Sequence, residues 1–162
     1  MDWSRSAQAW IDFVDRGDAN RNILLDPIVR KHCGDVAGMH VLDIGCGEGR
    51  FCRWLSEQGA LVIGIDPTSD LLKVAAERGG GATYVEGTAE HLPIASGSQD
   101  LVLSYLSLID IPDFRKAIAE MARVLSYGGK LVVANCSAIA TSGSSHGWIR
   151  SSDGEKLMWP IT

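Results

Sequence analysis

Apolar and polar residues follow two patterns along the chain. Short continuous apolar runs, typical of buried parallel strands, occupy residues 41–44, 61–65, 83–85, 99–106 and 130–134. Stretches with apolar residues at helical spacing lie between several of these runs, at residues 49–58, 69–78 and 113–125. The alternation predicts an α/β fold, a doubly wound Rossmann-like sheet with parallel strand order 3-2-1-4-5.

The chain begins with a segment that precedes the first predicted strand. An apolar helical face is expected there, made by Trp3, Ala7, Trp10, Ile11 and Val14. A break around Gly17 follows, and a second short helix is expected to start at Asp26 and Pro27 and to stop before Gly34. Packing of both helices on the sheet is the simplest interpretation.

A glycine-rich turn follows the first strand, in the sequence Val-Leu-Asp-Ile-Gly-Cys-Gly-Glu-Gly-Arg-Phe. Gly45, Gly47 and Gly49 would let a ligand lie against the backbone, where free N–H groups point towards the start of a helix. A dinucleotide-binding fingerprint would place its third glycine at position 50, but that residue is Arg50. The glycine pattern alone is therefore weak evidence for any one ligand.

Two acidic residues narrow the choice of ligand. Asp43 lies in a buried strand, where it needs partners such as loop N–H groups or a cationic ligand group, although it could also serve only to fix its own loop. Asp66 ends the next apolar run, 21 residues after Gly45, near the spacing at which a carboxylate meets ribose hydroxyls. A role for Asp66 as a helix cap is the alternative, but Thr68 and Ser69 are better placed for it.

With these residues in place, the chain resembles the class I S-adenosylmethionine-dependent methyltransferases, of the small-molecule, type 11-like kind. The resemblance rests on VLDIGCGEGRF and VIGIDPTSDLL as first and second motifs, and on EGTAEHLP as the third. Thr88 stands in the third motif where the family commonly has an acidic residue. A fourth motif is the strand at residues 99–106, where the family usually has Phe-Asp at the position of Gln99-Asp100. The likeness covers about residues 38–135, and the four motifs occur in the family's order and spacing.

The resemblance implies an enzyme that transfers a methyl group from S-adenosyl-L-methionine to a small-molecule acceptor. The implied cofactor-binding residues are Asp43, Gly45, Cys46, Gly47, Asp66, Pro67, Thr88, Ala89, Glu90, Ser104 and Tyr105. Tyr105, Asp110 and His146 are candidates for a general base, and none of them is assigned. The implied organisation is a helical lid segment at residues 1–36, a cofactor-binding domain at 37–136 and a C-terminal segment at 137–162.

Composition narrows the choice of partners. The net charge of −5 and the absence of a basic stripe argue against a nucleic-acid partner. The four cysteines and four histidines show no metal-ligand spacing, so no metal site is predicted. We also expect no membrane span and a cytoplasmic location, because no apolar run has membrane length and no signal-peptide pattern opens the chain.

The C-terminal segment departs most from the resemblance. The family's sheet normally continues with strands 6 and 7, for which residues 137–162 leave too little room. We therefore expect a truncated chain or a sheet edge completed by a partner chain, which would make a homo-oligomer. A catalytically silent, cofactor-binding module is one alternative function. An NAD-dependent oxidoreductase is another, and Asp43 and Arg50 argue against it.

Overall fold

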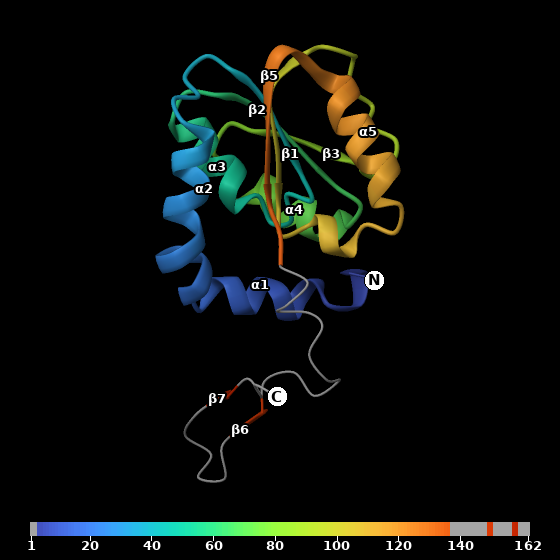
Figure 1. The fold of residues 1–162 in the computed structure, drawn as a ribbon. Coiled ribbons are helices and arrows are strands. Elements are labelled where there is room, and N and C mark those ends of the chain that lie inside the picture. The colour runs from blue at the N-terminus through green and yellow to red at the C-terminus, as the bar shows by residue number, and fades with distance from the viewer. Residues whose placement is uncertain (1–2, 137–148, 151–156, 159–162) are drawn as a thin grey trace.

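The computed structural model describes residues 3–136, 149–150 and 157–158. Its centre is a five-stranded parallel sheet with the order β3-β2-β1-β4-β5, which confirms the expected fold and strand order (Figure 1). The strands are β1 (His40–Ile44), β2 (Leu61–Asp66), β3 (Thr83–Glu86), β4 (Gln99–Tyr105) and β5 (Leu125–Ala134). The central strands β1 and β4 are buried almost throughout, as continuous apolar runs require.

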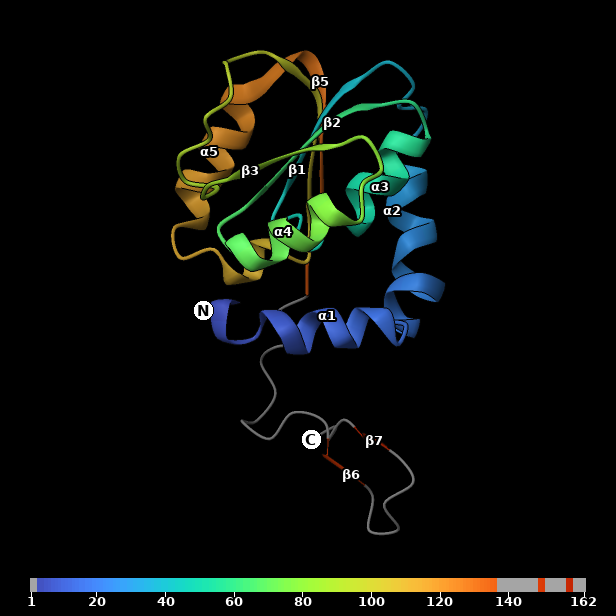
Figure 2. The same ribbon diagram turned by 180° about the vertical axis from the view of Figure 1, so that it is seen from behind.

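Helices cover both faces of the sheet. One face carries α2 (Asp26–Cys33), α3 (Arg50–Glu57) and α4 (Ser69–Glu77), and α5 (Phe114–Val124) covers the other (Figures 1 and 2). Cys52 and Leu55 of α3 form part of the first core, whereas Ala117 and Met121 of α5 belong to the second. All four side chains are fully buried, so both cores stabilise the sheet that carries the site.

The N-terminal segment lies across the carboxyl ends of the strands, as both ribbon views show (Figures 1 and 2). It consists of a short 3-10 helix, η1 (Trp3–Arg5), then α1 (Ala7–Asp15) and a π-helix, η2 (Asn20–Leu25), that runs directly into α2. Ala7 and Ile11 of α1 pack against Leu71 of α4. The expected apolar face is therefore present, and its small core lies on a helix instead of on the sheet.

Two local elements differ from the sequence interpretation. The segment before Asp26 is helical, although a helix was expected to begin only there; Leu25 is the N-cap and Pro27 occupies the first turn. The helix expected at residues 113–125 ends at Val124, and β5 begins at Leu125, before the strand expected at 130–134, because Leu125 already pairs with Gln99. A register shift between Gln99 and Leu101 absorbs the extra residues.

Two short strands, β6 (Ile149–Arg150) and β7 (Leu157–Met158), pair antiparallel with each other. The rest of the predicted C-terminal segment lies outside the described residues. Within the described strands, β5 pairs with β4 and forms one edge of the main sheet. No helix in the described ranges is long and apolar enough to cross a membrane.

Candidate functional site

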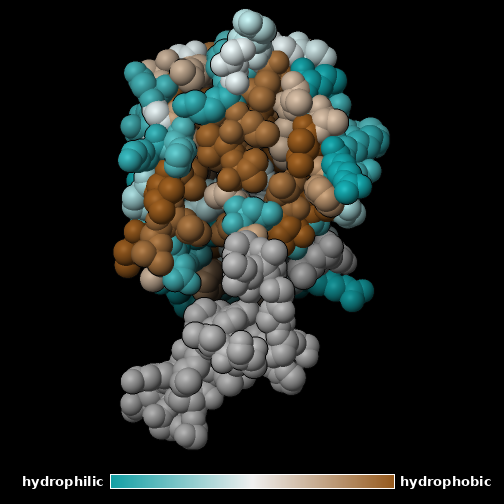
Figure 3. Space-filling view, in the orientation of Figure 1, coloured by the Kyte–Doolittle hydropathy of each residue, from teal (hydrophilic) through white to brown (hydrophobic). Residues whose placement is uncertain are grey.

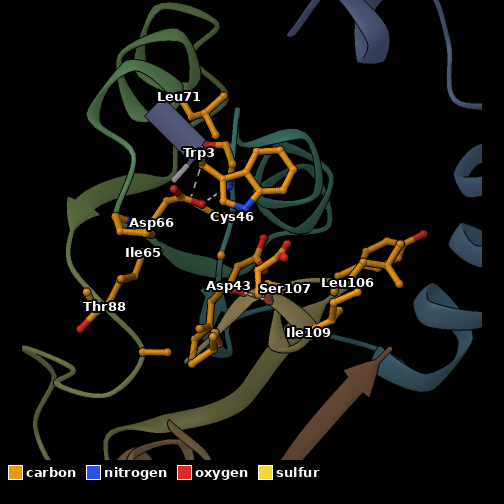
Figure 4. A pocket seen from close by; sticks show the side chains of 18 of the residues that line it. Trp3, Asp43, Cys46, Ile65, Asp66, Leu71, Thr88, Leu106, Ser107 and Ile109 are labelled. Atoms are coloured by element: carbon orange, nitrogen blue, oxygen red, sulfur yellow. Dashed lines mark hydrogen bonds between the residues drawn. The ribbon is translucent and has the colours of Figure 1, made fainter. Parts of the chain in front are cut away.

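A cavity of about 490 Å³ lies at the carboxyl ends of the central strands. The loops that follow β1, β2, β3 and β4 line it, and residues of the N-terminal segment form a further wall. Figure 4 shows Asp43, Asp66 and Trp3 around this space, with Leu106, Ser107 and Ile109 on another side. The volume is that of a small-molecule site, and its position is the one at which open parallel sheets bind ligands.

The glycine turn is held by backbone hydrogen bonds to the neighbouring strand. The N–H groups of Gly45 and Cys46 both donate to the carbonyl oxygen of Ile65, at 2.7 and 3.1 Å. The N–H of Gly47 donates to Oδ2 of Asp66 at 2.9 Å. The turn thus enters α3 in a conformation fixed by β2.

Gly45 and Gly47 both have positive φ angles, of 70° and 56°, but their surroundings differ. A Cβ on Gly45 would overlap Cβ of Ser107, so the protein itself leaves no room there. A Cβ on Gly47 would meet only Nε1 of Trp10, at 3.8 Å. The open space beside Gly47 belongs to the cavity, and it fits a ligand that lies against the backbone.

Asp66 is buried and organises the loop in two directions. Its Oδ2 binds the N–H of Gly47, and its Oδ1 accepts from the N–H of Thr68 at 2.9 Å. Thr68 is the N-cap of α4, as expected, although its side chain makes no capping bond. Each carboxylate oxygen can accept a second hydrogen bond, so Asp66 can still receive two hydroxyl groups from a ligand.

Asp43 is buried, but the expected hydrogen bonds from loop N–H groups are not formed. The Cys52 thiol donates to Oδ2 of Asp43 at 3.2 Å, while the loop N–H groups bind Ile65 and Asp66 instead. Burial raises the pKa of Asp43 to about 6. Because Asp43 also lines the cavity, a cationic ligand group would stabilise its charged form.

A buried ion cluster supports the wall formed by Tyr105. Asp26 accepts hydrogen bonds from both terminal nitrogens of Arg50 and, at 2.8 Å, from the hydroxyl of Tyr105. Burial opposes the charge of Asp26, but the hydrogen bonds from Arg50 and Tyr105 lower its pKa. The pKa of Tyr105 is raised by burial and by the bond to Asp26, which keeps the phenol protonated as the donor of that bond.

The wall after β4 contains a backbone with unusual geometry. Ser107 donates to the carbonyl oxygen of Ile44 at 2.6 Å and also contacts the hydroxyl of Ser104 at 2.8 Å. Between them, Leu106 has a φ of 57°, the one positive value at a non-glycine residue in the described part of the chain. Such strain is held by surrounding bonds and often marks a ligand site. It turns Leu106 and Ser107 towards the cavity.

The cavity brings together ten of the eleven residues expected to bind the cofactor. They are Asp43, Gly45, Cys46, Gly47, Asp66, Pro67, Thr88, Ala89, Glu90 and Tyr105. Ser104 is fully buried and is not in the lining; its hydroxyl reaches the site through Ser107. Whether the ten residues bind a cofactor remains a prediction.

Several lining residues were missed by the sequence interpretation. Trp3, Trp10 and Arg21 come from the N-terminal segment, and Leu106, Ser107, Ile109 and Ile111 follow β4. Trp3 and Trp10 were interpreted as part of one apolar helix face, and the structure shows that both are partly exposed and line the cavity. Large indole rings are seldom left in water without a contact, and this is the sequence signal that could have identified Trp3 and Trp10 as lining residues.

No cluster of three or more potential metal ligands occurs in the part of the chain that the structure describes. The three buried cysteines, Cys33, Cys46 and Cys52, are free thiols. The charged side chains that line the cavity include the carboxylates of Asp43, Asp66 and Asp110 and the guanidinium groups of Arg21 and Arg50.

Comparison with known proteins gives a consistent result. A family model described as a methyltransferase domain matches residues 42–133. Malonyl-[acyl-carrier protein] O-methyltransferase of Pectobacterium atrosepticum is 32% identical over 114 residues, which cover 70% of this chain and 45% of that protein. Demethylmenaquinone methyltransferase of Thermobifida fusca is 39% identical over 102 residues, covering 60% of this chain and 43% of that protein.

The fold has close counterparts among solved structures. An S-adenosylmethionine-dependent methyltransferase from Mesorhizobium loti superposes with a TM-score of 0.73 at 31% identity, over 91% of this chain and 66% of that chain. The chain spans somewhat under half the length of the two relatives named above.

Proposed function

The chain belongs to the S-adenosylmethionine-dependent methyltransferase family, and from this membership we propose that it takes part in methyl transfer from S-adenosylmethionine to a small-molecule acceptor. The main observation behind the proposal is the hydrogen bond that joins the loop after β2 to the loop after β1. Asp66 holds Gly47 in place and keeps free acceptor capacity beside the open space that Gly47 leaves.

The residues of the cavity fit this cofactor in charge and in shape. Asp66 is placed to accept ribose hydroxyls, and Asp43 offers a carboxylate to an ammonium group. The buried Ala89 and the exposed Thr88 lie after β3, on the side of the cavity where the third motif is expected to meet the adenine. The absence of a carboxylate at Thr88 leaves backbone groups as the main polar contacts there.

When bound, S-adenosylmethionine supplies a methyl group that its sulfonium already activates. The remaining task of the protein is to position the acceptor in line with that methyl group and to exclude water. The aromatic and apolar walls formed by Trp3, Leu106 and Ile109 suit this task. They favour an acceptor with an apolar part next to the reacting atom.

No residue is assigned as a general base. Tyr105 is engaged as a donor to Asp26, which removes it from the candidates. Asp110 lines the cavity at the end of the 3-10 helix η3 (Leu108–Asp110), and a deprotonation of the acceptor could use it. The third candidate, His146, lies outside the described residues.

The decisive experiment measures binding and transfer on the same protein. Calorimetric titration should show binding of S-adenosylmethionine and none of NADH, the ligand of the alternative oxidoreductase function. Incubation with methyl-labelled S-adenosylmethionine and a pool of small metabolites should then transfer label to a small molecule. Binding without transfer favours the silent module, and binding of NADH alone rejects the proposal.

A further inference from the structure

The guanidinium group of Arg21 lines the cavity and, in the described part of the chain, forms an ion pair with one carboxylate. Arg21 lies in the π-helix η2, a rare element that often occurs at functional sites. Its Nε forms an ion pair with Oδ2 of Asp18 at 3.3 Å. Within the described residues its side chain donates no hydrogen bond, although a guanidinium carries five N–H donors.

Two aromatic rings fix the position of this group. The Arg21 guanidinium carbon lies 4.7 Å from the ring centre of Trp10 and 5.3 Å from that of Tyr105. Such contacts hold the guanidinium plane while leaving its N–H edges free. The side chain is only 17% exposed, so the free edges are already largely removed from bulk water.

Arg21 has a weaker ion pair than the neighbouring Arg50, at 3.3 Å from one carboxylate oxygen. Arg30 and Arg50 both pair with Asp26, and Arg21 pairs with Asp18. Three guanidinium groups thus share two ion-paired carboxylates, and Asp43 is a third carboxylate close enough to act on Arg21 electrostatically. Burial and the nearby charge of Arg50 lower the pKa of Arg21, because both disfavour its cation. An anionic group of a ligand would stabilise that cation.

The position of Arg21 in the cavity indicates which anionic group of a ligand it would bind. Trp10, on which Arg21 stacks, also approaches the glycine turn, with its Nε1 3.8 Å from where a Cβ of Gly47 would be. Asp43 lies at the same end and interacts electrostatically with Arg21. A carboxylate group and a guanidinium group facing one space match the ammonium and carboxylate groups of an amino acid.

We propose that Arg21 binds the carboxylate of the amino-acid end of S-adenosylmethionine, so that the N-terminal segment completes a cofactor site that residues 42–133 leave open on one side. The inference rests on the proposed cofactor. It assigns to the segment before the matched domain a direct role in binding, through a residue that contacts the ligand and does not merely cover it.

The test compares two ligands that differ only at the end in question. S-adenosylhomocysteine carries the amino-acid end, whereas 5′-methylthioadenosine replaces it with a methyl group. Arg21→Gln should weaken binding of S-adenosylhomocysteine about tenfold to a hundredfold, the scale of hydrogen bonds between charged groups. Arg21→Gln should leave the affinity for 5′-methylthioadenosine unchanged. The affinity of Arg21→Lys for S-adenosylhomocysteine should lie between those of Arg21→Gln and the wild type.

Arg16→Gln is the matched control. Arg16 follows α1 on the same segment, is exposed, donates to the backbone of Asp12 and does not line the cavity. Its substitution should change neither affinity. Because only folded protein binds either ligand, the ratio of the two affinities does not depend on the folded fraction.

The outcomes separate this inference from the proposed function. If the wild type binds neither adenosine ligand, the proposed function fails and this inference fails with it. If the wild type binds S-adenosylhomocysteine and Arg21→Gln binds it equally well, this inference alone is rejected. An equal loss for both ligands also rejects it, because the effect would then be on the shape of the pocket.

Discussion

Asp66 accepts a hydrogen bond from the backbone N–H of Gly47 across 2.9 Å, and this bond joins the loop after β2 to the glycine turn after β1. The two loops are 19 residues apart in the sequence but form one polar surface in the cavity. A change at Asp66 should therefore affect both the ligand and the loop that holds it.

Replacing Asp66 by alanine should weaken S-adenosylmethionine binding by about 1.5–3 kcal/mol, because a charged acceptor for ligand hydroxyls is lost. The N–H groups of Gly47 and Thr68 lose their acceptor too, so a lower melting temperature should accompany the loss. Calorimetric titration and thermal denaturation measure the two effects. Unchanged affinity in a folded Asp66→Ala variant would contradict the ribose assignment.

Glu86→Gln provides the matched control for this experiment. Glu86 is the register partner of Asp66 on the neighbouring strand β3, is exposed and does not line the cavity. Its substitution removes one negative charge from the same edge of the sheet. Affinity should stay at the wild-type value, which excludes a general effect of charge.

The two glycines of the turn should respond differently to the same substitution. Gly45→Ala should destabilise the fold, because its Cβ would overlap Ser107. Gly47→Ala meets only distant atoms, so its cost to the fold is the positive φ alone, about 1–2 kcal/mol. Ligand binding should nevertheless be lost in Gly47→Ala. Urea denaturation and titration with S-adenosylmethionine measure the pair, and normal binding by Gly47→Ala would show that the turn does not cradle the cofactor.

Asp43 should make the stability of the ligand-free protein fall as the pH rises. Its pKa in the fold, about 6, lies above its ordinary value of 3.8, because burial disfavours the carboxylate. Between these two values the unfolded chain ionises first, so the native state loses relative stability over this window. Above it the cost is constant, at most about 3 kcal/mol if the full shift is expressed.

Asp43→Asn should remove that cost while preserving an acceptor for the Cys52 thiol. The stability gained over the wild type should be larger at about pH 7 than at about pH 4, as urea denaturation at both pH values would show. Glu57→Gln, at an exposed position on α3, is the control, and its stability should vary with pH as that of the wild type does. A gain that is equal at both pH values would contradict an elevated pKa.

Tyr105→Phe should reduce stability without changing the pH dependence of methyl transfer. The variant loses the hydrogen bond to Asp26, at a cost of about 1–2 kcal/mol, but keeps the ring that packs against Phe51. The measurement is a denaturation curve together with a pH profile of the transfer rate on the acceptor found in the labelling experiment. A profile that loses one ionisation in the variant would restore Tyr105 as a base.

The fold and the cofactor edge could be predicted because they depend on local pattern. Asp66 stands at the end of an apolar run, at a fixed spacing from the glycine turn, and the structure brings it to that turn. The order of the strands follows from the alternation of strand and helix. These features need no knowledge of which distant side chains meet.

The polar cluster behind the site could not be predicted in the same way. Asp26 was read as the start of a helix, but it is the buried partner of Arg50, 24 residues later, and of Tyr105, 79 residues later. Arg50 was noted only because it replaces a glycine. Pairs at such separations are set by tertiary packing, and one sequence holds no periodic signal for them.

The hydrogen-bond partner of Asp43 could not be predicted from the sequence either. The sequence correctly marked it as a buried carboxylate in need of partners, but the partner that the structure provides is the thiol of Cys52. The loop N–H groups that were expected to bind it are taken by Ile65 and Asp66. Competition between acceptors for one donor is decided by geometry, which residue type alone does not reveal.

The last prediction concerns the edge of the sheet formed by β5. Among the described strands it pairs only with β4, and Leu131 and Val133 are 36% and 41% exposed. Figure 3 shows a hydrophobic area in the middle of the face along which β5 runs. An apolar edge with free N–H and C=O groups is a template for pairing with another strand.

We therefore expect the 162-residue chain to associate with itself through this edge at raised concentration. Val133→Lys should weaken the association, because a charged side chain on an edge strand opposes pairing. Thr83→Lys, at an exposed position of the opposite edge strand β3, is the control and should have no effect. Sedimentation velocity over a range of concentrations measures the outcome. A wild-type chain that stays monomeric throughout that range would show that β5 does not pair between copies, and equal loss of association in both variants would place the contact elsewhere.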